Sequence, residues 1–199
     1  MNKDYETGVL LIISGPTCAG KDTVMRKLLD KNKKMQRLVT TNSRPKRSDE
    51  KEGEDYYFVS LEEFEELIAK DAFFEWVEYR GHYRGGQKKH VDEALKSGKD
   101  IVWRIDVRGV KNIYDKVKEF YPRSAFIFLT APLKVLKERI RERGVDSFKE
   151  QEWSIRRARW ELRQGQSFDY IVENKDRHLK EAVEAVEGIA EAVRRENIK

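Results

Sequence analysis

Residues 15–23, GPTCAGKDT, combine two glycines, a lysine and small polar side chains at a spacing that suits phosphate binding. Gly15 and Gly20 permit a tight loop whose backbone N–H groups point at phosphate oxygens, and Lys21 adds a mobile positive charge. A glycine-containing turn can match this pattern by chance, but the apolar run at 9–13 predicts the buried strand from which such a loop starts. We therefore expect contacts to ATP from Gly15, Pro16, Thr17, Cys18, Ala19, Gly20, Lys21, Asp22 and Thr23.

The residue after the lysine is unusual, because Asp22 stands where a serine or threonine hydroxyl normally binds Mg²⁺. A carboxylate can also face the ion, directly or through water, although it repels phosphate. We expect Asp22 and Thr23 to be the magnesium-side residues of this loop.

A second anion site is suggested by the charged segment 41–55 and the tyrosines that follow it. A kinase for a phosphorylated acceptor needs such a site, and arginine forks and tyrosine hydroxyls match phosphate oxygens well. A solvated charged loop would have the same composition, so this segment alone does not show whether a phosphate binds here. The candidate residues are Arg44, Lys46, Arg47, Tyr56 and Tyr83.

A second arginine set, with Arg139 and Arg143 four residues apart, shares one face of a predicted helix. Pointed at ATP, these side chains would neutralise charge in the transition state of phosphoryl transfer. Their alternation with Glu138 and Glu142 is equally typical of an exposed helix with salt bridges.

Apolar strands alternate with amphipathic helices through most of the chain. We expect strands at 9–13, 101–107, 125–129 and 170–172, and helices at about 21–30, 110–117, 132–143, 150–164 and 179–193. This alternation predicts an α/β fold with a parallel sheet flanked by helices. Ligands of such sheets bind at the carboxyl ends of the strands, which places Thr40, Asp106 and Thr130 on the same rim as the loop.

Residues 40–90 interrupt this alternation and are interpreted as an inserted subdomain. A short strand at 36–41 precedes a polar loop, and the capping box of Ser60 and Glu63 predicts a helix to about residue 70. A strand at 73–79, a turn-rich connector at 81–86 and a helix at 88–97 complete the segment.

The composition is that of a highly charged chain without an apolar segment long enough to span a membrane. Its 199 residues carry a net charge of +5, too modest for a nucleic-acid-binding face, and the only cysteine is Cys18. One cysteine cannot form an internal disulfide, and the first residues lack the apolar core of a signal peptide. We expect a cytoplasmic protein, monomeric or homodimeric, that binds neither nucleic acid nor membrane.

Taken in order, six sequence blocks make the chain resemble guanylate kinases from about residue 8 to 175. The blocks are ISGPTCAGK, VTTNSRPKRSDEKEGEDYYFVS, DAFFEWVEYRGHYRGG, RIDVRGV, RERGVDS and DYIVEN. The resemblance implies a P-loop kinase with a core (1–39, 91–143 and 166–199), a subdomain that binds the nucleoside monophosphate (NMP; 40–90) and a lid (144–165). It also implies ATP and Mg²⁺ as cofactors and direct phosphorylation of GMP or dGMP to GDP.

By position, the resemblance assigns roles to individual residues. Arg44, Arg47 and Tyr56 match ligands of the GMP phosphate, with Tyr83 and Arg84 beside them, and Thr40, Glu75 and Asp106 match residues near the guanine. Glu75 suits this role chemically, because guanine offers two adjacent N–H donors to a carboxylate. Lys21, Arg139 and Arg143 match residues on the ATP phosphates, and Asn174 matches a residue near the adenine.

Several positions depart from the pattern that this resemblance implies. Asp22 replaces a hydroxyl residue, Arg104 replaces the first acid of a D-I-D motif, and Arg84 replaces a tyrosine. Gly86 stands where a serine or threonine contacts the base, and Ser154 stands where a lid arginine is expected, with Arg156 and Arg157 as nearby substitutes.

These departures keep two alternatives open. The Lys-Asp pair at 21–22 also resembles ribose 1,5-bisphosphate phosphokinases, which would not need Glu75. A non-catalytic guanylate-kinase-like binding module is the other, although such a module has no need of an intact phosphate loop. The catalytic set expected for a GMP kinase is Lys21, Arg44, Arg139, Arg143 and Arg157.

Overall fold

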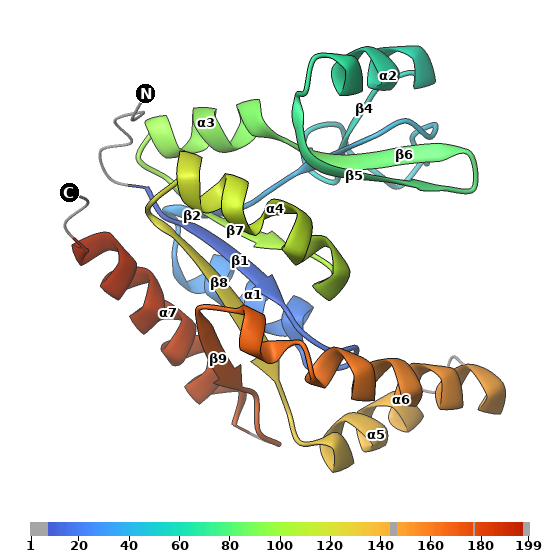
Figure 1. Cartoon of the computed structure of the whole chain (residues 1–199), viewed down its shortest axis with the longest axis vertical. Coiled ribbons are helices and arrows are strands. Elements are labelled where there is room, and N and C mark those ends of the chain that lie inside the picture. Colours follow the sequence, from blue (N-terminus) through green and yellow to red (C-terminus); the bar gives the residue numbers. More distant parts are fainter. Residues whose placement is uncertain (1–7, 144–146, 177, 197–199) are drawn as a thin grey trace.

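A five-stranded parallel sheet forms the core of the protein, as expected (Figure 1). The computed structural model describes residues 8–143, 147–176 and 178–196. The strand order is β2-β7-β1-β8-β9, and each pair of neighbours is parallel. The strands are β1 (Leu10–Ser14), β2 (Met35–Arg37), β7 (Asp100–Arg104), β8 (Ser124–Thr130) and β9 (Tyr170–Glu173).

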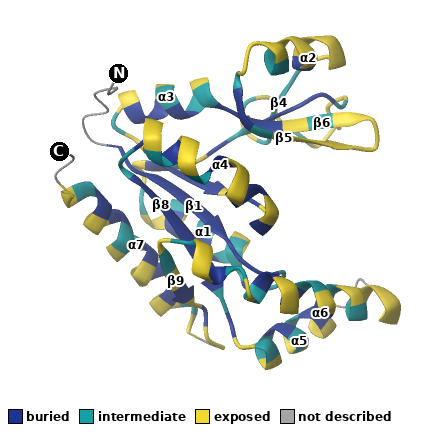
Figure 2. Ribbon diagram, in the orientation of Figure 1, coloured by how far each residue is buried: buried dark blue, intermediate teal, exposed yellow. Residues whose placement is uncertain are grey.

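Helices cover both faces of this sheet because successive buried side chains of each strand point to opposite sides. On one face, α1 (Lys21–Lys31) and α7 (Leu179–Arg195) pack against Leu11 and Ile13. On the other face, α3 (Lys88–Lys96) and α4 (Val107–Phe120) pack against Leu10 and Ile12. The central strands β1 and β8 are accordingly buried, whereas the helices expose their outer sides (Figure 2).

A second sheet lies within the segment that interrupts the core. Its order is β4-β3-β6-β5, built from β3 (Thr40–Asn42), β4 (Tyr56–Phe58), β5 (Phe73–Tyr79) and β6 (His82–Gln87). Helix α2 (Leu61–Ala69) begins with the predicted capping box of Ser60 and Glu63. Phe64 of this helix stacks on Phe73 with ring centroids 4.4 Å apart, which anchors α2 to the sheet.

Three predicted boundaries within these sheets were wrong. The strand expected at 36–41 is two strands, β2 and β3, that belong to different sheets. The connector expected at 81–86 is strand β6, because Arg80 (φ 54°) and Gly81 (φ 74°) alone make the two-residue hairpin turn. The strand expected to reach residue 107 ends at Arg104, because Asp106 already caps the N-terminus of α4.

Two further helices, α5 (Leu133–Glu142) and α6 (Phe148–Leu162), form a pair beside the phosphate loop. Leu136 and Ile140 of α5 pack with Ile155 and Ala158 of α6, and Ala19 of the loop joins this cluster. The predicted break at 144–149 falls partly outside the described residues, and α6 begins two residues before the expected Glu150, with Ser147 as its cap. A one-turn 3-10 helix, η1 (Gly165–Ser167), leads from α6 to β9.

The second sheet and the α5–α6 pair both project from the same side of the core (Figure 1). Among the described helices, none has the length and apolar character that crossing a membrane would require.

Candidate active site

The phosphate loop follows β1 directly, and its shape requires glycine at both predicted positions. Gly15 has φ 140°, and a Cβ there would lie 1.9 Å from the backbone oxygen of Leu129. Gly20 has φ 91°, and a Cβ there would lie 2.3 Å from Nδ2 of Asn174. Both positions therefore combine a left-handed or extended positive-φ backbone with a close neighbour, which only glycine tolerates.

Lys21 folds back over this loop. Its Nζ donates hydrogen bonds to the backbone oxygens of Gly15 (2.7 Å) and Pro16 (2.8 Å). Burial lowers the pKa of Lys21 to about 8, and the charge of Arg104 adds to this effect while Glu161 opposes it. The two carbonyl oxygens compensate only part of the charge of this ammonium group, so an anionic phosphate would stabilise it further.

A cavity of about 630 Å³ lies on this loop and has the size of a nucleotide-binding pocket. Asn174 closes one wall, since its Nδ2 donates to the backbone oxygen of Ala19 at 2.8 Å. Arg139 extends from α5 and donates to the backbone oxygens of Asn174 (3.2 Å) and Cys18 (3.5 Å). The predicted residues that line the cavity are Thr17, Cys18, Gly20, Lys21, Asp22, Thr23, Arg139, Arg143 and Asn174.

Helix α6 is tied to the loop through a buried acid that the sequence reasoning missed. Glu161 is 2% exposed, and its carboxylate accepts hydrogen bonds from the backbone N–H of Thr17 (2.9 Å) and from Nε of Arg157 (2.8 Å). Arg157 also forms an ion pair with Asp106 of the core. The signal for Glu161 was its position four residues after Arg157, where the two side chains share a helix face.

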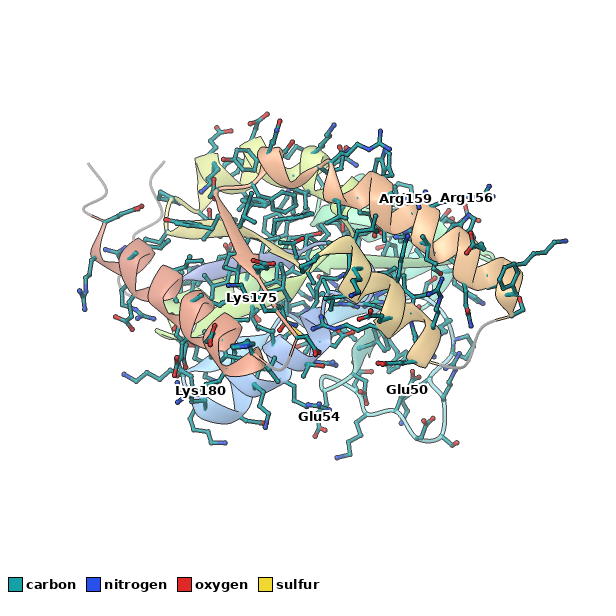
Figure 3. The ribbon with its side chains drawn as sticks, turned by 90° about the horizontal axis from the view of Figure 1, so that it is seen from below. Glu50, Glu54, Arg156, Arg159, Lys175 and Lys180 are labelled. Carbon is teal, nitrogen blue, oxygen red and sulfur yellow. The ribbon has the colours of Figure 1, made fainter. Side chains whose placement is uncertain are left out.

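Arg156 and Arg157, the two arginines considered as substitutes for position 154, have different surroundings. Arg157 is turned toward the core and its acids, whereas Arg156 and Arg159 are exposed on α6 (Figure 3). Of the neighbouring arginines, Arg157 is thus the one that the structure places near the site.

On the second sheet, Arg44 and Arg84 converge on the ring of Tyr56. Their guanidinium carbons lie 5.4 Å and 4.9 Å from its centroid, and Nε of Arg84 donates to Oγ1 of Thr40 at 3.1 Å. Arg44 makes a two-pronged ion pair with Glu50, which the sequence reasoning also missed. The bond from Arg44 lowers the pKa of Glu50 to about 2, so this carboxylate occupies Arg44 as a phosphate would.

Two other predicted acceptor residues lie apart from this cluster. Arg47 is exposed, and its hydrogen bond is made by the backbone N–H to Glu50 at 2.9 Å. The ring of Tyr83 packs on Phe64 (5.4 Å) and Trp76 (5.3 Å), so Tyr83 contributes packing of the second sheet.

Glu75 on β5 is an acid without a hydrogen-bond partner among the described residues. Burial and then the charge of Asp106 raise the pKa of its carboxyl to about 7, while Arg84 opposes this shift. The carboxyl lies against α4, where a Cβ at Gly109 would be 2.2 Å from Oε2. Gly109 was not predicted, because its role depends on a contact between distant elements.

Asp106 has a structural partner for each of its oxygens. It caps α4 by accepting the backbone N–H of Arg108 at 3.0 Å, and it pairs with Arg157. Burial acts to raise the pKa of Asp106, but the bonds from Arg108 and the charge of Arg157 hold it below its usual value.

Three departures from the expected pattern, at Asp22, Arg104 and Gly86, make specific contacts in the structure. Asp22 and Arg104 form an ion pair of 3.1 Å, although 82 residues separate them. Gly86 lies against the indole of Trp103, and a Cβ there would be 3.0 Å from that ring. The indole therefore fills the space that a larger residue at position 86 would need.

Comparison with known proteins agrees with this geometry. The sequence model of the family "Guanylate kinase" matches residues 7–193. The chain is 41% identical over 179 residues to a guanylate kinase of Gloeobacter violaceus, which covers 89% of this chain and 84% of that protein. It is 37% identical over 183 residues to one of Caldanaerobacter subterraneus subsp. tengcongensis, covering 92% of this chain and 86% of that protein.

A solved structure shares the fold as well. The crystal structure of guanylate kinase from Anaplasma phagocytophilum superimposes with a TM-score of 0.68 at 26% sequence identity, covering 96% of this chain and 88% of that one. The phosphate loop, the arginine–tyrosine cluster and the extent of these matches lead to one conclusion: the chain belongs to the guanylate kinase family.

Proposed function

We propose that this protein transfers the γ-phosphoryl group of ATP to GMP, or dGMP, and forms GDP. The observation that carries the substrate assignment is Glu75, a half-buried carboxyl without a partner that lies next to the Arg44–Arg84–Tyr56 cluster. An ionised carboxylate there can accept both N–H groups on the Watson–Crick edge of guanine. Adenine and the pyrimidines do not offer that pair of donors, so Glu75 selects the base while the arginines hold the phosphate.

The transfer is a direct displacement in which the protein positions groups and neutralises charge. Lys21, Arg139 and Arg143, which line the cavity, hold the ATP phosphates, and Asn174 in its wall contacts the adenine. Arg44, Arg47 and Tyr56 hold the acceptor phosphate, for which Arg44 must exchange its Glu50 partner. Arg157 remains the cation that links α6 to the core.

The residues at the metal side of the loop fit Mg²⁺ bound together with ATP. Asp22 keeps 72% of its side chain exposed, and Thr23 also lines the cavity, so both can offer oxygen ligands. Mg²⁺ usually keeps several waters and is bound through one or two protein carboxylates together with substrate phosphates. When bound, Mg²⁺ would neutralise charge on the transferring phosphates.

The second sheet within 40–90 and the segment 144–165 are the NMP-binding subdomain and the lid of this proposal. The second sheet and α6 project from the same side of the core, and closure of the two parts over the nucleotides would keep water from accepting the phosphoryl group (Figure 1). We further propose a cytoplasmic monomer or homodimer that acts on small molecules.

A coupled ADP-release assay with ATP and Mg²⁺ tests this function across GMP, dGMP, AMP, CMP, UMP and ribose 1,5-bisphosphate. We expect turnover with GMP and dGMP only, and its loss in Lys21→Ala. Lys27→Ala is the matched control, since Lys27 is an exposed lysine on the same helix.

The other outcomes separate the alternatives. Turnover with ribose 1,5-bisphosphate but not GMP would identify a sugar-phosphate kinase. A folded protein that turns over none of these acceptors would contradict catalysis and favour a binding module. Wild-type rates in Lys21→Ala would refute the role of the phosphate loop.

A further inference from the structure

Arg104 is a cation at the phosphate loop to which the function proposed above assigns no task. It is the last residue of β7 and lies in register with Ile13 of β1, two residues before the loop begins. It lines the same cavity as Lys21 and Arg139. Since β7 is a central strand, the backbone of Arg104 is held rigidly at the carboxyl edge of the sheet.

The guanidinium of Arg104 lies within electrostatic reach of both substrate sites. After the larger effect of burial, its charge lowers the pKa of Lys21 on the ATP side. On the acceptor side, partial desolvation and then the charge of Arg104 lower the pKa of Arg84. Because Arg104 also lines the cavity at the phosphate loop, its charge is available to the phosphates that bind there.

The present partner of Arg104 is a weak one. Nη1 of Arg104 lies 3.1 Å from Oδ2 of Asp22, with side chains 42% and 72% exposed. An ion pair this exposed contributes little to stability, whereas phosphate offers an arginine two charged acceptors at once. By contrast, Arg157 is held by the buried Glu161 in addition to Asp106.

We propose that Arg104 is a catalytic residue of phosphoryl transfer, held by Asp22 until substrates bind and then moved onto the phosphates. This role rests on the proposed kinase function. An oxygen of the acceptor phosphate forms a bond to the γ-phosphorus while the bond to the β–γ bridging oxygen breaks, and the electron pair of the broken bond stays on ADP. Arg104 neutralises charge on the equatorial oxygens during this step, and no proton needs to move.

The first test is the kinetics of Arg104→Ala, with Arg26→Ala as control because Arg26 is an exposed arginine on α1. We expect Arg104→Ala to lower kcat by about 10³-fold or more with smaller changes in both KM values, as for other arginines that act in the transition state. Guanidinium ion added to Arg104→Ala should restore part of kcat, and the melting temperature should change little. A purely structural ion pair would instead leave kcat close to the wild-type value and show no rescue.

The second test measures binding without turnover, with inorganic tripolyphosphate as the probe in the presence of EDTA. If Asp22 competes for Arg104, Asp22→Asn should bind the probe at least about fivefold more tightly than the wild type. This gain should disappear in the double variant Asp22→Asn/Arg104→Ala, because the freed cation is then absent. An equal gain in both backgrounds would mean that Asp22 only repels the probe, and would contradict the exchange.

The two tests also distinguish failure of this inference from failure of the proposed function. A wild type that turns over GMP while Arg104→Ala keeps kcat within about threefold overturns the role of Arg104 alone. A wild type without turnover overturns the kinase function and with it the catalytic role. The tripolyphosphate experiment then still decides whether Arg104 leaves Asp22 for phosphate.

Discussion

Replacing Glu75 by glutamine should stabilise the protein at alkaline pH while it impairs recognition of GMP. Burial raises the pKa of this carboxyl from 4.5 to about 7. Between these two values the folded state keeps a proton that the unfolded state has released, so stability falls as the pH rises through this window. A pKa of about 7 in the folded protein, against 4.5 in the unfolded chain, corresponds to a cost of up to about 3 kcal/mol at pH 8, and to none at pH 4. Glutamine has nearly the same shape and carries no charge, so Glu75→Gln should recover about 1–3 kcal/mol at pH 8.

The assay is urea unfolding followed by tryptophan fluorescence at pH 4.5 and pH 8. Glu78→Gln is the matched control, because Glu78 is three residues further on the same strand and is exposed. It should leave the free energy of unfolding nearly unchanged at both pH values. In parallel, Glu75→Gln should raise the KM for GMP by about 10²-fold. The reason is that the glutamine NH₂ group would face an N–H donor of guanine, where the carboxylate oxygen of Glu75 accepts a hydrogen bond. The KM for ATP should stay close to the wild-type value.

Two results would refute this reasoning. A change in stability that is the same at both pH values would show that Glu75 is not held protonated by its surroundings. An unchanged KM for GMP would show that the base is recognised elsewhere, even if the stability behaves as expected.

Two further predictions concern Gly86 and Lys21, whose surroundings are described above. Gly86→Ser should lower the free energy of unfolding by about 1–3 kcal/mol without tighter GMP binding, because its Cβ would lie 3.0 Å from Trp103 and 3.3 Å from Leu38. Urea unfolding and GMP titration check this prediction. An equally stable variant that binds GMP more tightly would contradict it. Because the pKa of Lys21 is about 8 in the empty loop, binding of ADP should take up protons at pH 8.5 and almost none at pH 6.5. Calorimetry in two buffers with different ionisation enthalpies measures this uptake, and its absence at pH 8.5 would show that Lys21 is already fully charged.

The phosphate loop could be predicted because its signals are local. Gly15 and Gly20 have positive φ angles that residues other than glycine rarely adopt, and the apolar run before them indicates a buried strand. The same local reasoning found the capping box of α2 and the parallel core sheet. The capping box, and each strand and helix whose alternation predicted the sheet, depend on residues that lie close together in the sequence.

The glycines of β6 show where local reasoning failed. Gly85 and Gly86 suggested a turn, but their φ angles are not positive, and the space around them explains their presence. A Cβ at Gly85 would lie 2.7 Å from the ring of Phe73, and Gly86 makes room for Trp103. These glycines allow distant side chains to approach, and nothing in the adjacent sequence reveals that need.

The partners of the charged residues were unpredictable for the same reason. Glu161 reaches Thr17 across 144 positions, and Arg104 reaches Asp22 across 82. Charges are plentiful in this chain, so a given acid has many possible partners until the fold selects one. The sequence could show which residues were unusual, but only the packing of β7 beside β1 shows that two of them meet.

The contact between Arg104 and Asp22 bears on how much of the catalytic rate depends on arginines of the lid. Relative to the pattern implied by the resemblance, a neutral residue became Asp22, an acid became Arg104, and an arginine became Ser154. The formal charges of these three changes cancel, so one arginine has in effect moved from the lid helix to a central strand. The backbone of a residue on β7 is held by the core sheet, whereas the position of one on α6 depends on how that helix lies against the core. Because preorganised charge needs no reorganisation during the reaction, the loss at position 154 need not lower the catalytic rate if Arg104 acts as proposed.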